Sequence, residues 1–334
     1  MISRLRSRTR NYMKADSLQQ IADKLWAEDN FILVGHAIPD GDCIGSLVGL
    51  YLGLTSVGKN CAMFLADPVP PIYRYLAGSD KIQILNQEIM GDTIVYLDCS
   101  DVQRIGEKEA GYLKKTKYTI NIDHHYTNDV FADYNLVDAG AAATAEIIFN
   151  LLDAMKIKLN QDIASALYTG IVMDTGRFNY SNTTSRTMRI AAALLDTGLD
   201  LDAIRINLFE SRPRKEIQVL GQALQSLAFS EDGRIAWVCL SYEQLTDMNA
   251  VEIYPEDIIN YTRMIAGVEV GLSFREIEPG IVKIGFRSKN RTDVAAIAAR
   301  WGGGGHKKAA GARQNGTLEE VTKLVIASVK DVLD

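Results

Sequence analysis

Acidic residues and histidines gather directly after three short apolar stretches of the sequence. The stretches are "FILVG" (31–35), "TIVYL" (93–97) and "TINI" (119–122), and the residues that follow them are His36, Asp40, Asp42, Asp98, Asp123, His124 and His125. The chain has only four histidines, and two are adjacent here. Carboxylates and imidazoles without a thiolate suit Mn²⁺, Mg²⁺ or Co²⁺ better than structural zinc. The residue types therefore predict a divalent metal site.

Each of these residues alone also has an ordinary structural explanation. His36 could pack or cap a helix, Asp40 and Asp42 could form a turn and a helix N-cap, and Asp98 could cap the next helix. A further acid, Asp174, ends a predicted helix in "YTGIVMDTG" and could be a buried structural residue. The tripeptide Asp-Thr-Gly also marks aspartic proteases, but there it occurs in a β-rich lobe. The metal hypothesis thus depends on whether the fold brings the clusters together.

The elements that must position these side chains are predicted strands. Apolar runs without polar alternation are typical of strands covered on both faces of a parallel sheet, and the carboxyl ends of such strands form one ligand-binding edge. Residues 141–224 have helical periodicity, and strands and helices alternate again after about residue 226. We predict an α/β chain with an N-terminal parallel-sheet domain (1–190), a helical connector (191–225) and a smaller mixed α/β domain (226–334).

The second half of the chain supplies positive charge around a glycine run. Arg287, Lys289, Arg291, Lys307 and Lys308 surround Gly302–Gly305 and His306. A glycine run alone is usually a flexible linker, but successive glycine amides can also form an anion-binding nest, and an arginine offers a planar fork for a phosphate. An acidic metal edge together with a basic, glycine-rich segment suits the hydrolysis of a phosphate ester, in which two metals activate water and neutralise phosphoryl oxygens.

Composition limits the classes of partner. A formal net charge of −6 argues against a surface for long nucleic acid, and no apolar run is long enough for a membrane span. The N-terminus carries Arg4, Arg6, Arg8 and Arg10 without an apolar core after them, so we expect a solvated arm, with a weak contact to phosphates as the alternative. The four cysteines show no paired spacing, which predicts a reducing, cytoplasmic location.

The motifs together resemble those of the DHH phosphoesterase family. "HAIPDGDCIGS" (36–46) is similar to its first motif, Asp98 in "YLDCSD" to its second, "DHH" (123–125) to its third and "GIVMDTGRF" (170–178) to its fourth. "FRSKNRTDV" (286–294) and "GGGGHKKAAG" (302–311) resemble its first type of DHH-associated C-terminal domain. The resemblance covers about residues 17 to 330 and implies an active site in the cleft between the two domains.

The resemblance also implies roles for individual residues. His36 and Asp40 would bind one metal ion, and Asp42, His124 and Asp174 the other, with Asp98 bridging and Mn²⁺ as the expected metal. Asp123 would orient an imidazole, and His125 would contact the scissile phosphate or act as a general acid. The other end of the substrate would be held by Arg287, Ser288, Gly303, Gly304, Gly305 and His306.

Within the family, a two-domain chain of this length most resembles the oligoribonucleases that degrade nanoRNA and remove the 3′-phosphate of 3′-phosphoadenosine 5′-phosphate (pAp). The expected substrates are therefore short RNA and pAp, with linear dinucleotides such as pApA as the alternative and a homodimer compatible with the sequence. Ala143 stands where relatives often have serine. A non-catalytic nucleotide-binding module is a further alternative, whereas a dehydrogenase is disfavoured because the chain lacks Gly-x-Gly-x-x-Gly between a strand and a helix.

Overall fold

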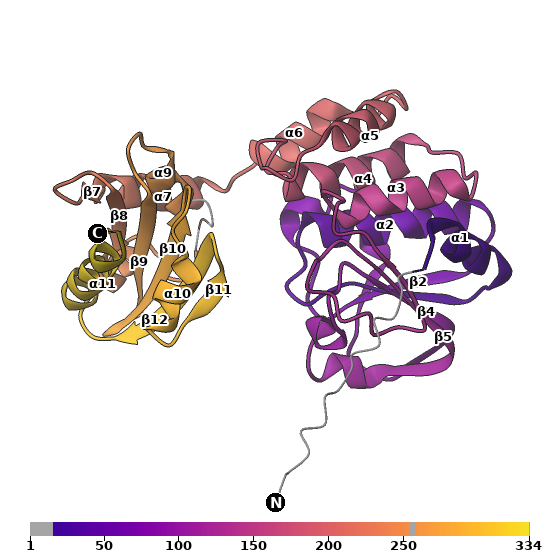
Figure 1. Ribbon diagram of the computed structural model, residues 1–334, viewed down its shortest axis with the longest axis horizontal. Helices are drawn as coiled ribbons and strands as arrows, with labels where there is room; N and C mark the ends of the chain where they lie inside the picture. The colour runs from indigo at the N-terminus through magenta and orange to yellow at the C-terminus, as the bar shows by residue number, and fades with distance from the viewer. Residues whose placement is uncertain (1–15, 254, 256–257, 334) are drawn as a thin grey trace, which may run out of the picture. The chain divides into compact units, whose positions relative to one another are not determined.

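The computed structural model describes residues 16–253, 255 and 258–333, so the arginines of the N-terminal arm lie outside the described residues. The chain forms two compact units (Figure 1), one up to Ser211 and the other from Arg212. This division falls within the stretch 191–225 that the sequence predicts as a helical connector. Within the described ranges, no helix is both long and apolar enough to cross a membrane.

The first unit is built on a parallel sheet, as predicted. Its strand order is β3-β2-β1-β4-β5-β6, and every neighbouring pair is parallel. The strands are β1 (Phe31–Val34), β2 (Cys61–Leu65), β3 (Ile82–Ile84), β4 (Ile89–Leu97), β5 (Leu113–Asp123) and β6 (Tyr134–Val137). The order reverses between β1 and β4, and in open α/β sheets this switch point is where ligands bind, at the carboxyl ends of the strands.

Both faces of this sheet are buried because its strands are apolar on both sides. Phe31 and Leu33 of β1 face the main core, whereas Ile32 and Val34 belong to a smaller cluster on the opposite face. Helices cover the main-core face (Figure 1), and short 3₁₀ helices contribute to the other. The helical elements are α1 (Leu18–Ala27), α2 (Gly41–Ser56), α3 (Thr144–Ala154), α4 (Gln161–Asp174), η1 (Pro71–Tyr73), η2 (Ser79–Lys81), η3 (Val102–Ile105) and η4 (Glu109–Tyr112).

The helices after α4 are divided between the two units. Helix α5 (Ser185–Leu195) packs on α3 and α4, and α6 (Leu201–Phe209) packs on α4. Helix α7 (Arg214–Gln225) instead packs on β8 (Ile235–Leu240) and α9 (Ile258–Met264) of the second unit. Its apolar residues Val219 and Ala223 are fully buried there, in a cluster with Val238 and Leu240.

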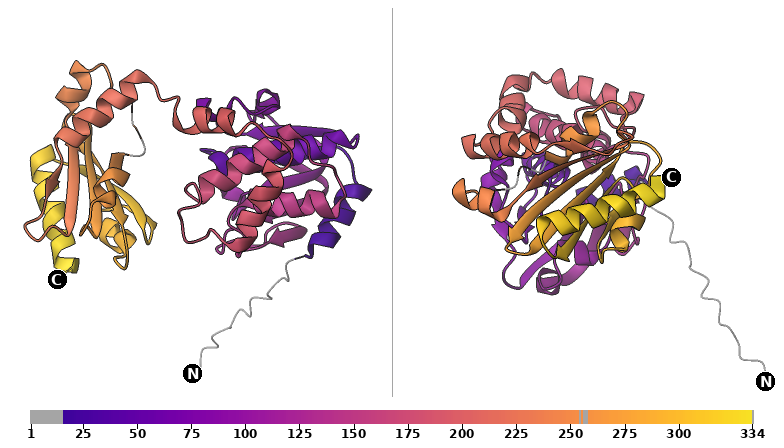
Figure 2. Two further views of the ribbon diagram at one scale, coloured as in Figure 1. Left: turned by 90° about the horizontal axis from the view of Figure 1, so that it is seen from above. Right: turned by 90° about the vertical axis from the view of Figure 1, so that its left-hand side faces the viewer.

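The second unit has a mixed sheet, as predicted, with the order β11-β12-β10-β9-β8-β7. Among the described strands of this second sheet, only β8 and β9 pair in parallel; the other pairs are antiparallel. Helix α11 lies on one face of this sheet (Figure 2) and contributes to one core cluster, whereas α7 and α9 contribute to a second cluster. The elements are β7 (Ala228–Phe229), β8 (Ile235–Leu240), α8 (Tyr242–Asp247), α9 (Ile258–Met264), β9 (Val270–Glu278), β10 (Ile281–Ser288), α10 (Val294–Ala299), β11 (Gly304–His306), β12 (Ala309–Asn315) and α11 (Leu318–Leu333).

Candidate metal centre

Three neighbouring strands place the predicted residues at one edge of the first sheet. His36 follows β1, Asp98 directly follows β4, and Asp123 ends β5, and these strands are adjacent in the order β1-β4-β5. Asp98 lies between two histidines: its Oδ2 is 3.4 Å from His36 Nε2, and its Oδ1 is 3.6 Å from His124 Nε2. One carboxylate thus has an oxygen near each of two imidazoles.

The first group of possible metal ligands is His36, Asp40 and Asp98. His36 Nε2 is 3.7 Å from Asp40 Oδ1, and His36 Nδ1 is 2.8 Å from the carbonyl oxygen of Ala37. A carbonyl oxygen can only accept, so Nδ1 carries the proton and Nε2 is available as a ligand in the neutral ring. Asp40 is also the N-cap of α2, where it accepts hydrogen bonds from the amides of Asp42 and Cys43.

The second group is Asp42, His124 and Asp174. His124 Nε2 lies 3.9 Å from Asp42 Oδ2 and 3.5 Å from Asp174 Oδ2. The Asp42 carboxylate is buried and accepts hydrogen bonds from the amides of Thr144 (2.6 Å) and Ala145 (2.9 Å) at the start of α3. Asp42 therefore caps α3 from across the core, whereas the N-cap residue itself, Ala143, provides no side-chain bond.

The carboxylates at this edge repel one another. Burial, together with the charges of Asp98, Asp174 and Asp40, raises the pKa of Asp42 well above its usual range. Burial and the charges of Asp98 and Asp40 raise the pKa of Asp174 to about 6, although His124 opposes this shift. Divalent cations relieve such repulsion. Oxygen and imidazole donors converging around shared negative charge fit one or more divalent metal ions.

His125 lies beside this centre and is held by Asp123. His125 Nδ1 donates to Asp123 Oδ1 over 2.7 Å, and the fully buried Asp123 also accepts from the His124 amide (2.8 Å) and from Asn128 Nδ2 (2.6 Å). The hydrogen bond to Asp123 raises the pKa of His125. His125 Nδ1 is also 3.7 Å from Asp98 Oδ1, and with His124 these residues form a third possible group. Since Nδ1 binds Asp123, Nε2 is the ring nitrogen left for a further interaction.

Two contributors were not found from the sequence. Thr144 Oγ1 donates to Asp98 Oδ1 over 2.9 Å, and Asn128 holds both Asp123 and the carbonyl oxygen of Cys99. The only sequence signal for Thr144 was its place at the start of a predicted helix, where amides attract anions. Asn128 was a polar loop residue shortly after the paired histidines. Neither pattern distinguishes such a residue from an ordinary cap or turn.

The predicted substrate-binding residues lie in the second unit, at one end of its sheet. Arg287 and Ser288 end β10, and β11 pairs with β12 through Gly304, Gly305 and His306. The buried Ser288 hydroxyl donates to the carbonyl oxygen of Thr292 over 2.7 Å and so holds the turn after β10. His306 is exposed.

Close backbone approach explains part of the glycine run. A Cβ on Gly303 would lie 2.1 Å from the carbonyl oxygen of Gly311, and one on Gly305, whose φ is +143°, would lie 2.6 Å from that of Ala309. Side chains at these two positions would separate the backbones that β11 and β12 bring together. The run therefore leads directly into the sheet, to which Gly304 and Gly305 belong, and is not a linker.

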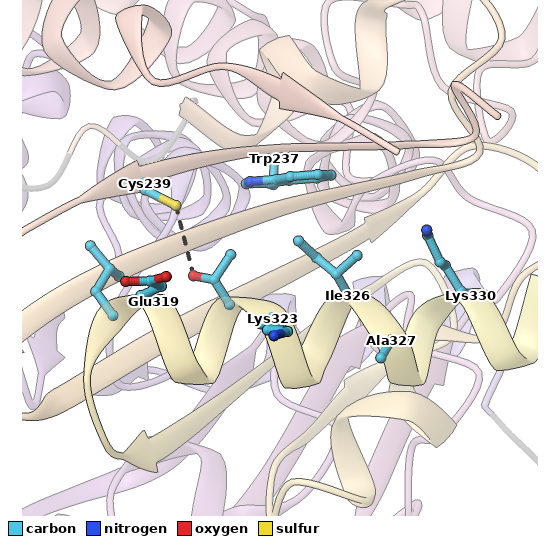
Figure 3. A pocket seen from close by; sticks show the side chains of 9 residues that line it. Trp237, Cys239, Glu319, Lys323, Ile326, Ala327 and Lys330 are labelled. Carbon is cyan, nitrogen blue, oxygen red and sulfur yellow. Dashed lines mark hydrogen bonds between the residues drawn. The ribbon is translucent and has the colours of Figure 1, made fainter. Parts of the chain in front are cut away.

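The second unit also has a groove between β8 and α11 (Figure 3), with a volume of about 680 Å³. Trp237 and Cys239 line its β8 side, and Ile326 and Lys330 are among the residues on its α11 side; Cys239 Sγ is 3.8 Å from Thr322 Oγ1. Strands β9, β10 and β12 separate β8 from β11 in the sheet. The groove is thus not formed by the predicted substrate-binding residues.

Comparisons with known proteins agree with this two-unit organisation. The DHH family N-terminal domain matches residues 30–171, and the DHHA1 domain matches residues 238–333. A bifunctional oligoribonuclease and PAP phosphatase from Thermus thermophilus is 33% identical, and the match covers 95% of each chain. A protein of the same name from Bacillus subtilis is 29% identical, over 85% of this chain and 89% of its own.

The fold is also that of a solved structure. An exopolyphosphatase-related protein from Bacteroides fragilis superposes with a TM-score of 0.86 at 26% identity, over 94% of this chain and 95% of its own. Both predicted fold types, the parallel sheet and the smaller mixed sheet, are thereby confirmed.

Proposed function

Because the chain belongs to the DHH family, we propose that it is a metal-dependent phosphoesterase that hydrolyses short oligoribonucleotides to mononucleotides and pAp to AMP and phosphate. The observation that carries this proposal is the position of Asp98, with one oxygen toward His36 and the other toward His124. The substrates are those named for the relatives that match this chain over most of its length.

We assign the metal ligands in two sets that share Asp98. His36 and Asp40 would hold one ion, and Asp42, His124 and Asp174 would hold the other. Mn²⁺ is the proposed metal, and the same donors also suit Mg²⁺ or Co²⁺. When bound, such a pair supplies an activated water and neutralises charge on the phosphoryl oxygens.

The chain's own residues complete the reaction at the leaving oxygen. His125 keeps Nδ1 bound to Asp123, so Nε2 carries the other proton of the charged ring. As the bond between phosphorus and the leaving oxygen breaks, Nε2 gives that proton to the oxygen, and Asp123 stabilises the ring throughout. The hydrogen bond to Asp123 raises the pKa of His125 and so favours the protonated, acid form of the ring.

We assign recognition of the remaining part of the substrate to the second unit. Arg287 offers a planar cation, the amides of Gly303, Gly304 and Gly305 offer donors, and the exposed His306 offers a ring nitrogen. Ser288 supports this surface by holding the turn after β10.

The four cysteines, Cys43, Cys61, Cys99 and Cys239, are free, which supports a cytoplasmic location. The homodimer stays a prediction.

The test is turnover of defined substrates by the purified chain. With Mn²⁺, we expect hydrolysis of a short RNA and of pAp, and loss of both activities in chelator; pApA in parallel measures the alternative activity. Asp98→Asn should abolish turnover because it removes the negative charge and one of the two oxygens of the shared carboxylate. Asp153→Asn, an equal charge change on the exposed side of α3, should leave it unchanged. Full turnover without metal, or none on any of these substrates, would reject the proposal.

A further inference from the structure

One short segment, residues 138–146, contacts metal-site residues at several points. The carbonyl oxygen of Ala141 lies 3.4 Å from His124 Nδ1. The other ring nitrogen of His124, Nε2, faces the carboxylates. The amides of Thr144 and Ala145 bind Asp42, and the Thr144 hydroxyl binds Asp98. The position of this segment therefore determines the orientation of three proposed ligands.

Arg186 holds this segment at both ends. Its Nε pairs with Oε1 of Glu146, and its Nη1 is 2.9 Å from Oδ2 of Asp138. Glu146 is fully buried, and its Oε2 accepts from the amide of Ala142 (2.9 Å) and from the hydroxyl of Thr187 (3.2 Å). A buried carboxylate is costly without a charged partner, so loss of Arg186 forces Glu146 and the segment around it to rearrange.

Asn182 ties the middle of the segment to another proposed ligand. Its Nδ2 donates to the carbonyl oxygen of Ala142 over 3.0 Å and to that of Asp174 over 3.1 Å. Asn182 precedes α5, the helix that carries Arg186. One side chain thus fixes the distance between the segment and the end of α4.

We propose that Arg186 and Asn182 are positioning residues that set the geometry of the metal centre through residues 138–146. Among the contacts of the described residues, neither side chain has a hydrogen bond or ion pair to the side chain of a proposed ligand. The contact of Asn182 with Asp174 is to the backbone carbonyl oxygen. Their effect passes through Ala141, Thr144 and Ala145. Groups that orient metal ligands in this way typically change metal affinity by about 10- to 100-fold when removed.

The test is Mn²⁺ affinity of the full chain, measured by calorimetry, which does not depend on turnover. Arg186→Gln should weaken Mn²⁺ binding by about tenfold or more. The matched control is Arg189→Gln, which removes the same charge from the same helix at an exposed position and should leave the affinity within about twofold of the native value. Arg186→Lys, which keeps the charge but not the planar fork, should recover part of the affinity.

A second measurement separates positioning from general loss of stability. Each variant is unfolded by denaturant with chelator and with Mn²⁺, and the shift of the midpoint caused by the metal is compared. A ligand stabilises the native state according to its affinity. Loss of a purely structural contact would therefore lower the unfolding midpoint equally with chelator and with Mn²⁺, and the shift caused by the metal would not change. Asn182→Ala, which leaves the pair between Arg186 and the buried Glu146 intact, gives the same readout if Arg186→Gln does not fold.

The inference rests on the proposed metal site, and the outcomes keep the two apart. If the native chain does not bind Mn²⁺, the proposed site fails. The positioning role is overturned if the native chain binds Mn²⁺ but the variants do not differ from it. In that case Asn182→Ala and the folded Arg186 variants would have the native Mn²⁺ affinity and the native metal-induced shift of the midpoint. A reduced shift with an unchanged Arg189→Gln control supports it.

Discussion

Asp123 and His125 form a hydrogen bond of 2.7 Å between Oδ1 and Nδ1, although Asp123 is fully buried and the His125 side chain is 34% exposed. The carboxylate raises the pKa of the ring, and a general acid works only while it is protonated. In Asp123→Asn the neutral amide no longer favours the charged ring. We expect the loss of kcat/KM at high pH to begin at a lower pH than in the native enzyme.

The control for this prediction is His125→Ala. Its residual kcat/KM should not show the loss at high pH, which is the high-pH limb of the pH profile. Asp123→Asn also keeps the shape of the buried side chain, so the far-ultraviolet circular dichroism should not change. An unchanged high-pH limb in a folded Asp123→Asn enzyme would show that Asp123 does not set the pKa of the acid.

Thr144 should affect the metal centre through its hydroxyl. Thr144→Val keeps the branched shape but removes the 2.9 Å hydrogen bond to Asp98, whereas Thr144→Ser keeps a donor. A hydrogen bond to a charged group contributes about 1.5–3 kcal/mol, so we expect Thr144→Val to lower kcat/KM by about 10- to 100-fold. Thr144→Ser should stay much closer to the native value. Equal activity of the valine and serine variants would contradict the prediction.

The metal-free protein should lose stability as the pH rises through the weakly acidic range. Burial and neighbouring carboxylates raise the pKa of Asp174 to about 6 and that of Asp42 well above normal, so the folded chain binds more protons than the unfolded chain between about pH 4 and 6. Stability falls with pH wherever the folded state binds more protons. The raised pKa of His125 also makes the stability of the metal-free protein fall with increasing pH, and it does so at higher pH than the carboxylates.

We therefore expect the Tm in chelator to fall between about pH 5 and 7.5, a range above the titration of ordinary carboxylates. With Mn²⁺ the stabilisation by metal should grow over the same range, because protons compete with the metal for Asp42 and Asp174. Asp174→Asn should reduce the slope measured in chelator. A rising Tm in chelator across this range would contradict the pKa shifts.

The sequence predicts the first unit well because its signals are local. Continuous apolar runs such as residues 31–35 are typical of buried parallel strands, and each run is followed by the residues of interest. Placing Asp98 and Asp123 at one sheet edge needed only the rule that parallel strands point the same way. The glycines before His306 also carried a local signal, since successive glycine amides can form an anion-binding nest, and that role stays a prediction.

The remaining features depend on contacts between distant residues, which leave no local pattern. Glu146 and Arg186 are 40 residues apart in sequence, and Asp42 caps a helix 102 residues away. A short polar residue at the start of a helix has the same appearance whether it caps that helix or orients a ligand. For the same reason, helical periodicity in residues 191–225 could not show that α5 and α6 pack with the first unit and α7 with the second.

His306 should contribute mainly to substrate binding. It lies in β11 of the second unit, is exposed, and its backbone pairs with Ala309. Since the proposed metal ligands all lie in the first unit, His306→Ala should leave the reacting centre intact and raise KM more than it lowers kcat. His306→Gln, which can still form a hydrogen bond, should keep a lower KM than the alanine variant. The measurement is steady-state hydrolysis of pAp with Mn²⁺; a fall in kcat at unchanged KM would instead assign His306 to the chemical step.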